Sequence, residues 1–236
     1  MFEDINNISV KPEVGNSTKP LLPAVPLSEV YLEDCVTALK RYANNHFDLA
    51  IVDPPYGINI CFSPDGKKLV TGRKSQNGLY TSLAKEKWDI RPNEEYFKEL
   101  FRVSKNQVVW GANFFTEYLP PKQAWIVWDK MNGESSFSDC ELAFTSFNTG
   151  LRIFRKTIET KNKIHICQKP VKLYDWILNK YAKEGDLILD THLGSGSSRI
   201  AAYKGGFNFV GFEINEHYYE KQEKRFNDFK SQLRLF

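Results

Sequence analysis

Short apolar runs alternate with amphipathic stretches from residue 29 to near the end of the chain, and this alternation limits the fold more than any other feature. Residues 47–52 and 186–190 have the length and composition of buried strands, whereas residues 170–182 repeat apolar side chains at helical spacing. Strands that alternate with helices are typical of a parallel sheet covered on both sides. The sequence therefore predicts an α/β fold with a mostly parallel central sheet and helices on both faces.

The same patterns predict the individual elements and one domain. Strands are expected at 29–32, 47–52, 107–110, 124–128, 141–147, 186–190 and 207–212, and helices at 34–42, 93–101, 170–182, 198–204 and 216–229. Residues 1–26 hold four of the eleven prolines and little periodicity, which predicts an extended N-terminal arm before a single domain at 27–236. Polar residues rich in Gly, Lys and Ser predict a long loop at 57–90.

Composition excludes several classes of protein. A hydrophobic content of 42% excludes disorder of the whole chain, and no run approaches the roughly 18 apolar residues of a membrane span. The start of the chain lacks a basic and apolar leader, so we expect no secretory signal. The four cysteines and four histidines show no ligand spacing. We therefore expect reduced thiols, no metal site and a cytoplasmic location.

The first motif is Asp53-Pro54-Pro55-Tyr56, which directly follows the apolar strand ending at Val52. Two prolines remove two backbone N–H groups and fix the chain, so nearby carbonyls remain available as acceptors. In open α/β sheets ligands bind at the carboxyl ends of the strands. The motif thus brings a carboxylate, a free carbonyl and an aromatic ring to a ligand-binding edge. The alternative is a strand-ending turn with a capping aspartate.

The second motif is a strand, a glycine turn and a helix, and it runs from Leu187 through Asp190 and Gly194-Ser195-Gly196-Ser197. Such a turn lets a ligand approach backbone amides at the N-terminus of a helix. Glu213 ends the next strand, where a carboxylate suits ribose hydroxyls. A dinucleotide fingerprint needs a third glycine, but Arg199 stands there. The turn therefore indicates a nucleoside ligand rather than NAD; the alternative is an ordinary glycine turn.

Taken together, these residues resemble the amino-group DNA methyltransferases that use S-adenosylmethionine, in the branch where the Asp-Pro-Pro-Tyr motif precedes the glycine motif. The resemblance covers about residues 29–229. It includes the lead-in strand at 47–52, Gln168-Lys169-Pro170-Val171 before a helix, and Phe212-Glu213 before the last helix. It implies a Rossmann-like methyltransferase fold in which strand 29–32 lies beside strand 207–212. Asp34 would then lie near the cofactor adenine or, alternatively, cap a helix.

The resemblance also implies roles for named residues. The catalytic residues would be Asp53, Pro54, Pro55 and Tyr56. The residues that bind S-adenosylmethionine, and its product S-adenosylhomocysteine, would be Asp34, Asp53, Lys169, Asp190, His192, Gly194, Ser195, Gly196, Ser197 and Glu213. Asp53 and the Pro54 carbonyl would accept the N–H bonds of an exocyclic amino group, while Tyr56 stacks on a base flipped from duplex DNA. No Pro-Cys dipeptide occurs, which disfavours methylation of cytosine carbon-5.

Two features depart from the family pattern. Thr191-His192 stand where the family usually has Pro-Phe after the aspartate of the glycine motif. The family usually carries a target-recognition segment between the central strands and the Gln-Lys-Pro region. That segment is short here, because only residues 148–163 lie between them. Specificity is therefore either relaxed or shared with the 57–90 loop. These departures keep open a DNA-binding protein of methyltransferase fold without turnover.

The net charge of +3 hides an uneven distribution. Residues 61–88 contain six basic and two acidic side chains, and residues 152–172 contain seven basic and one acidic. Both stretches look loop-like, and basic loops are typical of phosphate binding, although a solvated surface is the alternative. The predicted DNA contacts, in loop 57–90 and segment 148–165, are Lys67, Lys68, Arg73, Lys74, Arg152, Arg155 and Lys156.

The sequence therefore predicts a site-specific DNA methyltransferase that acts on N6 of adenine, because Asp at the head of the Pro-Pro-Tyr motif leans toward adenine in this family. An N4-cytosine enzyme is the main alternative. The implied partner is double-stranded DNA, with no membrane, and a homodimer stays open. Bacterial or phage-encoded enzymes, solitary or paired with a restriction enzyme in restriction–modification, all fit the sequence.

Overall fold

The computed structural model describes residues 25–58, 89–133, 138–159, 163–165 and 167–233. Nearly all of the predicted N-terminal arm and the basic positions Lys67, Lys68, Arg73 and Lys74 lie outside these residues. The three tryptophans of the middle strands are described. Trp110 and Trp128 are buried in the core, and Trp125 is partly buried at its edge.

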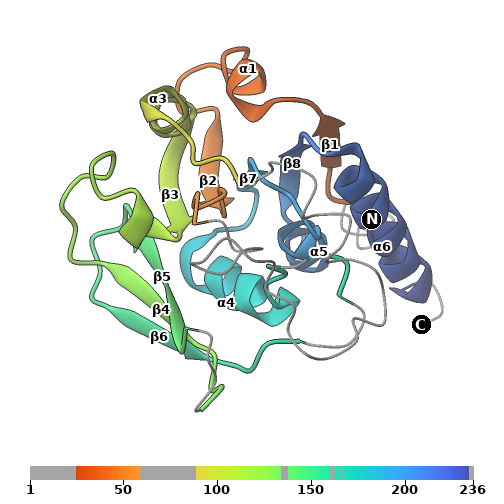
Figure 1. Cartoon of the computed structure of the whole chain (residues 1–236). Helices are drawn as coiled ribbons and strands as arrows, with labels where there is room; N and C mark the ends of the chain where they lie inside the picture. Colours follow the sequence, from red (N-terminus) through yellow and green to blue (C-terminus); the bar gives the residue numbers. More distant parts are fainter. Residues whose placement is uncertain (1–24, 59–88, 134–137, 160–162, 166, 234–236) are drawn as a thin grey trace, which may run out of the picture.

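The described residues form one eight-stranded sheet with the strand order β1-β8-β7-β2-β3-β5-β4-β6 (Figure 1). Only β5 runs antiparallel to its neighbours β3 and β4, and the other pairs are parallel. The sheet is therefore mostly parallel, as predicted. The strands are β1 Ser28–Leu32, β2 Phe47–Val52, β3 Ser104–Trp110, β4 Trp125–Asp129, β5 Cys140–Thr145, β6 Arg152–Arg155, β7 Leu187–Asp190 and β8 Asn208–Glu213.

Helices cover both faces of the sheet, which confirms the predicted fold class. Apolar side chains of α1 and α3 pack with Val52 on one face, and those of α4 and α5 pack with Leu49 and Ile51 on the other (Figure 1). Helix α6 lies beside α5 at the β1 end of the sheet (Figure 1). The helices are α1 Cys35–Leu39, α3 Glu94–Val103, α4 Val171–Tyr181, α5 Ser197–Lys204 and α6 Glu216–Leu233, with a short 3₁₀ turn η1 at Ala112–Phe114.

Strand β1 pairs with β8 in parallel, as the permuted motif order requires. Leu32 is aligned with Glu213, and the backbone N–H of Glu33 donates to the Glu213 carbonyl at 3.0 Å. The first strand of the chain thus completes the sheet beside the last strand. As a result, the segment after β1 reaches the same edge of the sheet as Glu213.

The prediction that residues 152–172 form a loop is wrong at Arg152–Arg155, because these residues form the edge strand β6 beside β4. The strand is only four residues long and mostly exposed, so it lacks the buried alternation that makes strands visible in a sequence. The Trp128 indole N–H donates to the Lys156 carbonyl at 2.8 Å and fixes the chain just beyond β6. Arg152 and Arg155 therefore project from a sheet edge rather than from a loop.

Arg199, which replaces the third glycine of a dinucleotide fingerprint, joins β1, α5 and α6. Its guanidinium donates to Ser28 Oγ at 3.0 Å, pairs with Glu223 at 2.7 Å and lies 3.8 Å from the Phe226 ring centre. The residue is 5% exposed. A charge that is buried this deeply is stable only while it is paired. Arg199 is thus part of the scaffold, which explains its place in the turn motif.

We predict that Arg199→Met lowers the free energy of unfolding by about 2–4 kcal/mol, because it removes the partners of Glu223, Ser28 and Gln222 together. The matched control is Lys224→Met on the same helix. Lys224 pairs with Asp228 in solvent, so its loss changes stability by less than about 0.5 kcal/mol. Urea unfolding followed by circular dichroism measures both. Equal effects of the two substitutions would contradict the proposed role of Arg199.

Candidate active site

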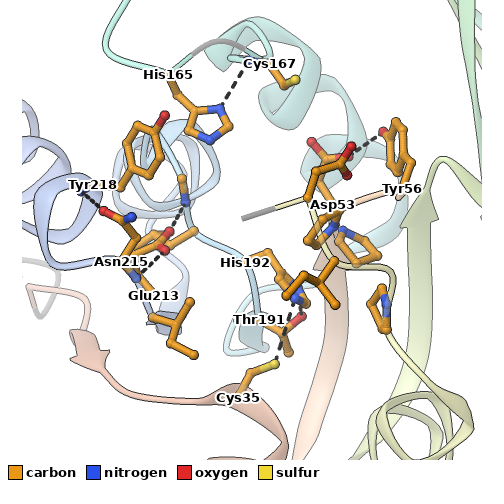
Figure 2. A pocket seen from close by; sticks show the side chains of 18 of the residues that line it. Cys35, Asp53, Tyr56, His165, Cys167, Thr191, His192, Glu213, Asn215 and Tyr218 are labelled. Carbon is orange, nitrogen blue, oxygen red and sulfur yellow. Dashed lines mark hydrogen bonds between the residues drawn. The ribbon is translucent and has the colours of Figure 1, made fainter. Parts of the chain in front are cut away.

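A cavity of about 890 Å³ lies at the carboxyl ends of β1, β2, β7 and β8. Asp34 follows β1, Asp53 follows β2, the glycine turn follows β7, and Glu213 ends β8. Figure 2 shows Asp53 and Tyr56 on one side of the cavity, Glu213 and Asn215 on the other, and His192 between them. Parallel strands end at one edge of the sheet, so residues far apart in the chain meet here. The two sequence motifs therefore share one cavity.

The Glu213 end of the cavity is built around a carboxylate that accepts backbone N–H groups. Glu213 Oε2 accepts from Gly194 at 2.8 Å, and Oε1 accepts from Asn215 at 2.9 Å. Burial raises the pKa of Glu213. Ile214, 71% exposed, adds an apolar surface to the same wall. This end thus combines a hydrogen-bond acceptor, a glycine turn and an apolar side chain.

Three residues that were predicted to bind the cofactor lie behind the cavity wall. Asp190 Oδ1 accepts from the His192 N–H at 3.0 Å and Oδ2 accepts from Ser198 Oγ at 2.5 Å, and burial raises its pKa to about 7. Gly196 caps α5 with a φ of 69°, and Ser197 Oγ lies 3.1 Å from Ser195 Oγ. None of the three is among the cavity-lining residues, whereas Gly194 and Ser195 are. The glycine turn is therefore supported, on the side away from the cavity, by Asp190, Gly196 and Ser197.

Asp34 caps helix α1 and also lines the cavity. Its Oδ1 accepts from the N–H and the hydroxyl of Thr37, each at 2.8 Å. The capping interpretation is thus confirmed. Because the same residue faces the cavity near Glu213, capping and a contact with the cofactor adenine are compatible.

His192 lies in a chain of hydrogen-bonding side chains at the floor of the cavity. Its Nδ1 lies 2.9 Å from Thr191 Oγ1, which in turn lies 2.7 Å from the Tyr96 hydroxyl, and its Nε2 lies 3.9 Å from Cys35 Sγ. Burial lowers the pKa of His192 to about 4, so the ring is neutral near pH 7. The imidazole and the Tyr96 ring make a T-shaped contact, with centroids 5.3 Å apart and ring planes at 73°. Thr191-His192 therefore form an ordered, uncharged wall.

The Asp53 end of the cavity holds a cluster of buried charges. The Tyr56 hydroxyl donates to Asp53 Oδ1 at 2.6 Å, and the Lys169 ammonium pairs with Asp53 Oδ2. Lys169 Nζ also lies 3.0 Å from Glu141 Oε2. The other carboxylate oxygen of Glu141, Oε1, lies 2.8 Å from Lys130 Nζ. Pro54 and Pro55 line the cavity beside this cluster. Asp53 is thus oriented on both of its oxygens.

Tyr56 packs its ring on Phe114, with centroids 5.1 Å apart and ring planes at 18°. The backbone passes directly beneath the ring at Gly111, where φ is 65°. A Cβ on Gly111 would lie 2.1 Å from Tyr56 Cε1. Gly111 is therefore needed for both its backbone conformation and the space that the Tyr56 ring occupies.

Several residues of the cavity have no signal in the sequence. Tyr96 and Tyr174 follow the apolar faces of α3 and α4, so each looks like an ordinary structural residue. Only long-range packing brings them to the site. The cavity-lining residues that sequence reasoning missed include Cys35, Tyr96, His165, Cys167, Tyr174, Ile214, Asn215 and Tyr218.

The predicted DNA contacts that the structure describes lie away from the cavity. Arg152 and Arg155 are exposed on β6, at the opposite edge of the sheet from β1, and Lys156 follows them. Arg155 Nε lies 3.3 Å from Asp129 Oδ2. Within the described ranges, no cluster of His, Cys, Asp and Glu could hold a metal ion, and no helix is long and apolar enough to cross a membrane.

We predict that Gly111→Ala destabilises the fold more than Gly133→Ala. Both positions have positive φ, but a Cβ on Gly133 meets nothing within 4 Å. The backbone strain of about 1–2 kcal/mol is therefore common to both, and the clash with Tyr56 adds about 1–3 kcal/mol at Gly111 only. In a Tyr56→Ala background, where the ring is absent, the extra destabilisation of Gly111→Ala over Gly133→Ala should disappear. Urea unfolding measures the free energies of unfolding. An excess that survives without the ring would show that Tyr56 is not its cause.

Comparisons with known proteins agree with this geometry. A family model described as DNA methylase, N6_N4_Mtase, matches residues 151–224. The type II methyltransferase M.HinfI of Haemophilus influenzae is 24% identical over 86% of this chain and 69% of its own length. The structure of an M1.HpyAVI–SAM complex superposes with a TM-score of 0.54 at 18% identity, covering 84% of this chain and 98% of that one. The structure of PvuII DNA methyltransferase, described as cytosine-N4-specific, superposes with a TM-score of 0.56 at 13% identity. The match covers 89% of this chain and 94% of that one. The structural likeness shows a shared fold. The family model and the sequence relatives support an amino-DNA methyltransferase, of the kind that acts on N6 of adenine or N4 of cytosine.

Proposed function

We propose that the protein transfers a methyl group from S-adenosylmethionine to the N6 amino group of adenine in double-stranded DNA. The observation that carries the proposal is the shared cavity, in which the Asp53-Pro54-Pro55-Tyr56 motif faces Glu213 and the Gly194 turn. One end has the groups that suit a nucleoside, and the other has acceptors for an amino group. Both substrates could therefore meet inside the same cavity.

The Glu213 end fits an adenosine-containing cofactor. The Glu213 carboxylate suits ribose hydroxyls, Ile214 offers an apolar face for a purine, and Asp34 lies beside them. Gly194 and Ser195 allow close approach of the backbone, while His192 forms the neutral wall toward Asp53. S-adenosylmethionine bound here would supply an electrophilic methyl group on a sulfonium. The product left in the cavity would be S-adenosylhomocysteine.

The Asp53 end fits the target amino group. The lone pair of an exocyclic amino nitrogen is delocalised into the base and is weakly nucleophilic. Asp53 and the Pro54 carbonyl would accept hydrogen bonds from the two N–H groups of this nitrogen. These bonds favour a tetrahedral nitrogen with an available lone pair. An ionised carboxylate has about four lone-pair sites, so Asp53 can accept a further bond beside those from Tyr56 and Lys169. Rate enhancement would come from positioning and charge, without a covalent bond to the enzyme.

The flipped base would stack on Tyr56. Adenine is proposed because aspartate at the head of the motif leans toward adenine in the family that the sequence resembles. N4-cytosine remains the second candidate, since PvuII methyltransferase shares the fold and is described as cytosine-N4-specific. The nitrogen chemistry at Asp53 is the same for both bases.

DNA would be held outside the cavity by basic side chains, as a domain spanning 27–236 with contacts from 57–90 and 148–165. Binding through such side chains releases counterions, so the affinity would fall steeply as salt rises. The proposed contacts are Lys67, Lys68, Arg73, Lys74, Arg152, Arg155 and Lys156.

The test is transfer of labelled methyl from S-adenosylmethionine to duplex DNA, followed by digestion to nucleosides and mass spectrometry. We expect N6-methyladenine, and we expect Asp53→Asn to lower the rate by about 100-fold or more because it removes the charged acceptor. Binding of S-adenosylmethionine to Asp53→Asn, measured by calorimetry, should change little. Asp228→Asn, at an exposed ion pair on α6, is the matched control.

Each contrary outcome has a separate meaning in this experiment. N4-methylcytosine as the product would replace adenine with the second candidate. Wild-type protein that binds DNA but methylates no base would refute the enzymatic proposal and favour a binding protein. Full activity in Asp53→Asn would refute the role of the Asp53 carboxylate.

A further inference from the structure

Lys169 is a buried cation that pairs with two carboxylates and donates to a phenol. Its side chain is 2% exposed, and Nζ pairs with Asp53 Oδ2, lies 3.0 Å from Glu141 Oε2 and donates to the Tyr56 hydroxyl at 3.3 Å. A lysine ammonium has three N–H donors and no acceptor. These partners all belong to the Asp53 cluster, whereas the resemblance implied that Lys169 binds the cofactor.

The cluster forms a closed ring of hydrogen bonds around the carboxylate of Asp53. Tyr56 accepts from Lys169 and donates to Asp53 Oδ1 at 2.6 Å, while Lys169 pairs with Oδ2. The plane of the carboxylate is thus fixed by contacts on both oxygens. Such a ring orients Asp53 before any substrate arrives, which is the preorganisation that electrostatic catalysis needs.

Glu141 anchors the ring to the antiparallel part of the sheet. It is the second residue of β5, and it pairs with Lys169 through one carboxylate oxygen and with Lys130 through the other, at 2.8 Å. Charges therefore alternate along Asp53, Lys169, Glu141 and Lys130. Removing one member of a buried alternating row leaves its neighbour unpaired, and that is strongly unfavourable.

We propose that Lys169 is a positioning residue for methyl transfer, which holds Asp53 ionised and oriented toward the target amino group, is itself anchored by Glu141, and does not contact the cofactor. This inference rests on the proposed function, because it assigns Lys169 to the amino-group end of the cavity. It also gives Glu141, which lies outside both sequence motifs, a part in the reaction.

The charges of the cluster determine in which direction each substitution shifts the pKa of Asp53. Burial raises the pKa of Asp53, the charge of Lys169 opposes that rise, and the charge of Glu141 adds to it. Glu141 stays ionised despite burial, since Lys169 and Lys130 lower its pKa to about 2. An ionised Asp53 accepts hydrogen bonds from the amino group more strongly than a protonated one, so the rate should depend on its ionisation. Removing Lys169 should therefore shift activity to higher pH, and removing the charge of Glu141 should shift it to lower pH.

The other groups around Asp53 do not compete for this role. Those that interact with it are phenols and a thiol whose pKa values are raised by burial, so they remain neutral, and one carboxyl group that lies beneath the glycine turn. They are Tyr56, Tyr96, Tyr174, Cys167 and Asp190. Lys169 is thus the cation that directly contacts Asp53 among the described residues.

The experiment compares Lys169→Met, Glu141→Gln and the double variant with wild type. The readout is the pH dependence of the single-turnover methyl-transfer rate at saturating S-adenosylmethionine, whose acid limb reports ionisation of Asp53. We expect the acid limb of Lys169→Met to move up by about 1–3 pH units. The Glu141→Gln limb should move to lower pH, and the double variant should lie between the two single variants.

Cofactor affinity and a control variant separate positioning from a merely structural role. The dissociation constant for S-adenosylmethionine should change less than about threefold in Lys169→Met if no contact is lost. Lys105→Met is the matched control, since Lys105 pairs with Asp48 at the other end of β2, at 2.6 Å. Its acid limb should coincide with that of wild type.

Two results would overturn the inference while leaving the proposed function intact. One is an active Lys169→Met variant whose acid limb is unchanged, and the other is a loss of cofactor affinity without a change of pH profile. If Lys169→Met does not fold, Glu141→Gln decides, because a limb that moves to higher pH contradicts the stated electrostatics. An inactive wild type would instead refute the proposed function itself.

Discussion

The parallel pairing of β1, β8, β7 and β2 is the constraint on which the rest of this molecule depends. Leu32 is aligned with Glu213, Asp190 with Gly211, and Ala50 with Leu189. This register brings the ends of four strands from distant parts of the chain to one edge of the sheet. Parallel strands need long crossovers, and the helices of those crossovers cover both faces. The cavity is thus a direct consequence of the way the sheet is ordered.

Polar groups buried at this edge have structural roles besides the chemical roles that we propose for them. Asp190 and Glu213 accept backbone N–H groups of the turn after β7 and so hold the turn in its shape. At the other end, Lys169 and Tyr56 hold Asp53 in one orientation. Buried charges are stable only when paired. The two ends of the cavity are therefore preorganised by the same kind of interaction.

Much of the architecture could be predicted from the sequence because it depends on local patterns. The strand at Phe47–Val52, the glycine turn and the alternation of strands with helices all lie within short segments. The edge strand β6 escaped prediction because its exposed residues carry no buried alternation. An edge strand obtains its structure from the neighbour with which it pairs, and a sequence pattern does not reveal that neighbour.

The candidate site could be predicted only in outline. The motifs indicated which residues gather at the cavity, but not which of them face it. Asp190 turned inward to support the turn, and Lys169 paired with Asp53 across 116 positions of sequence. Such contacts depend on side-chain packing between distant elements. For the same reason Glu141 and Tyr96 had no signal before the fold was known.

The central claim is that one cavity holds the methyl donor at the Glu213 end and the target amino group at the Asp53 end. The most direct measurement is a crystal structure of the protein with S-adenosylmethionine bound. The account predicts ribose hydroxyls on the Glu213 carboxylate and the reactive methyl group directed toward Asp53. A cofactor bound outside this cavity, or with its methyl group turned away from Asp53, would contradict the account.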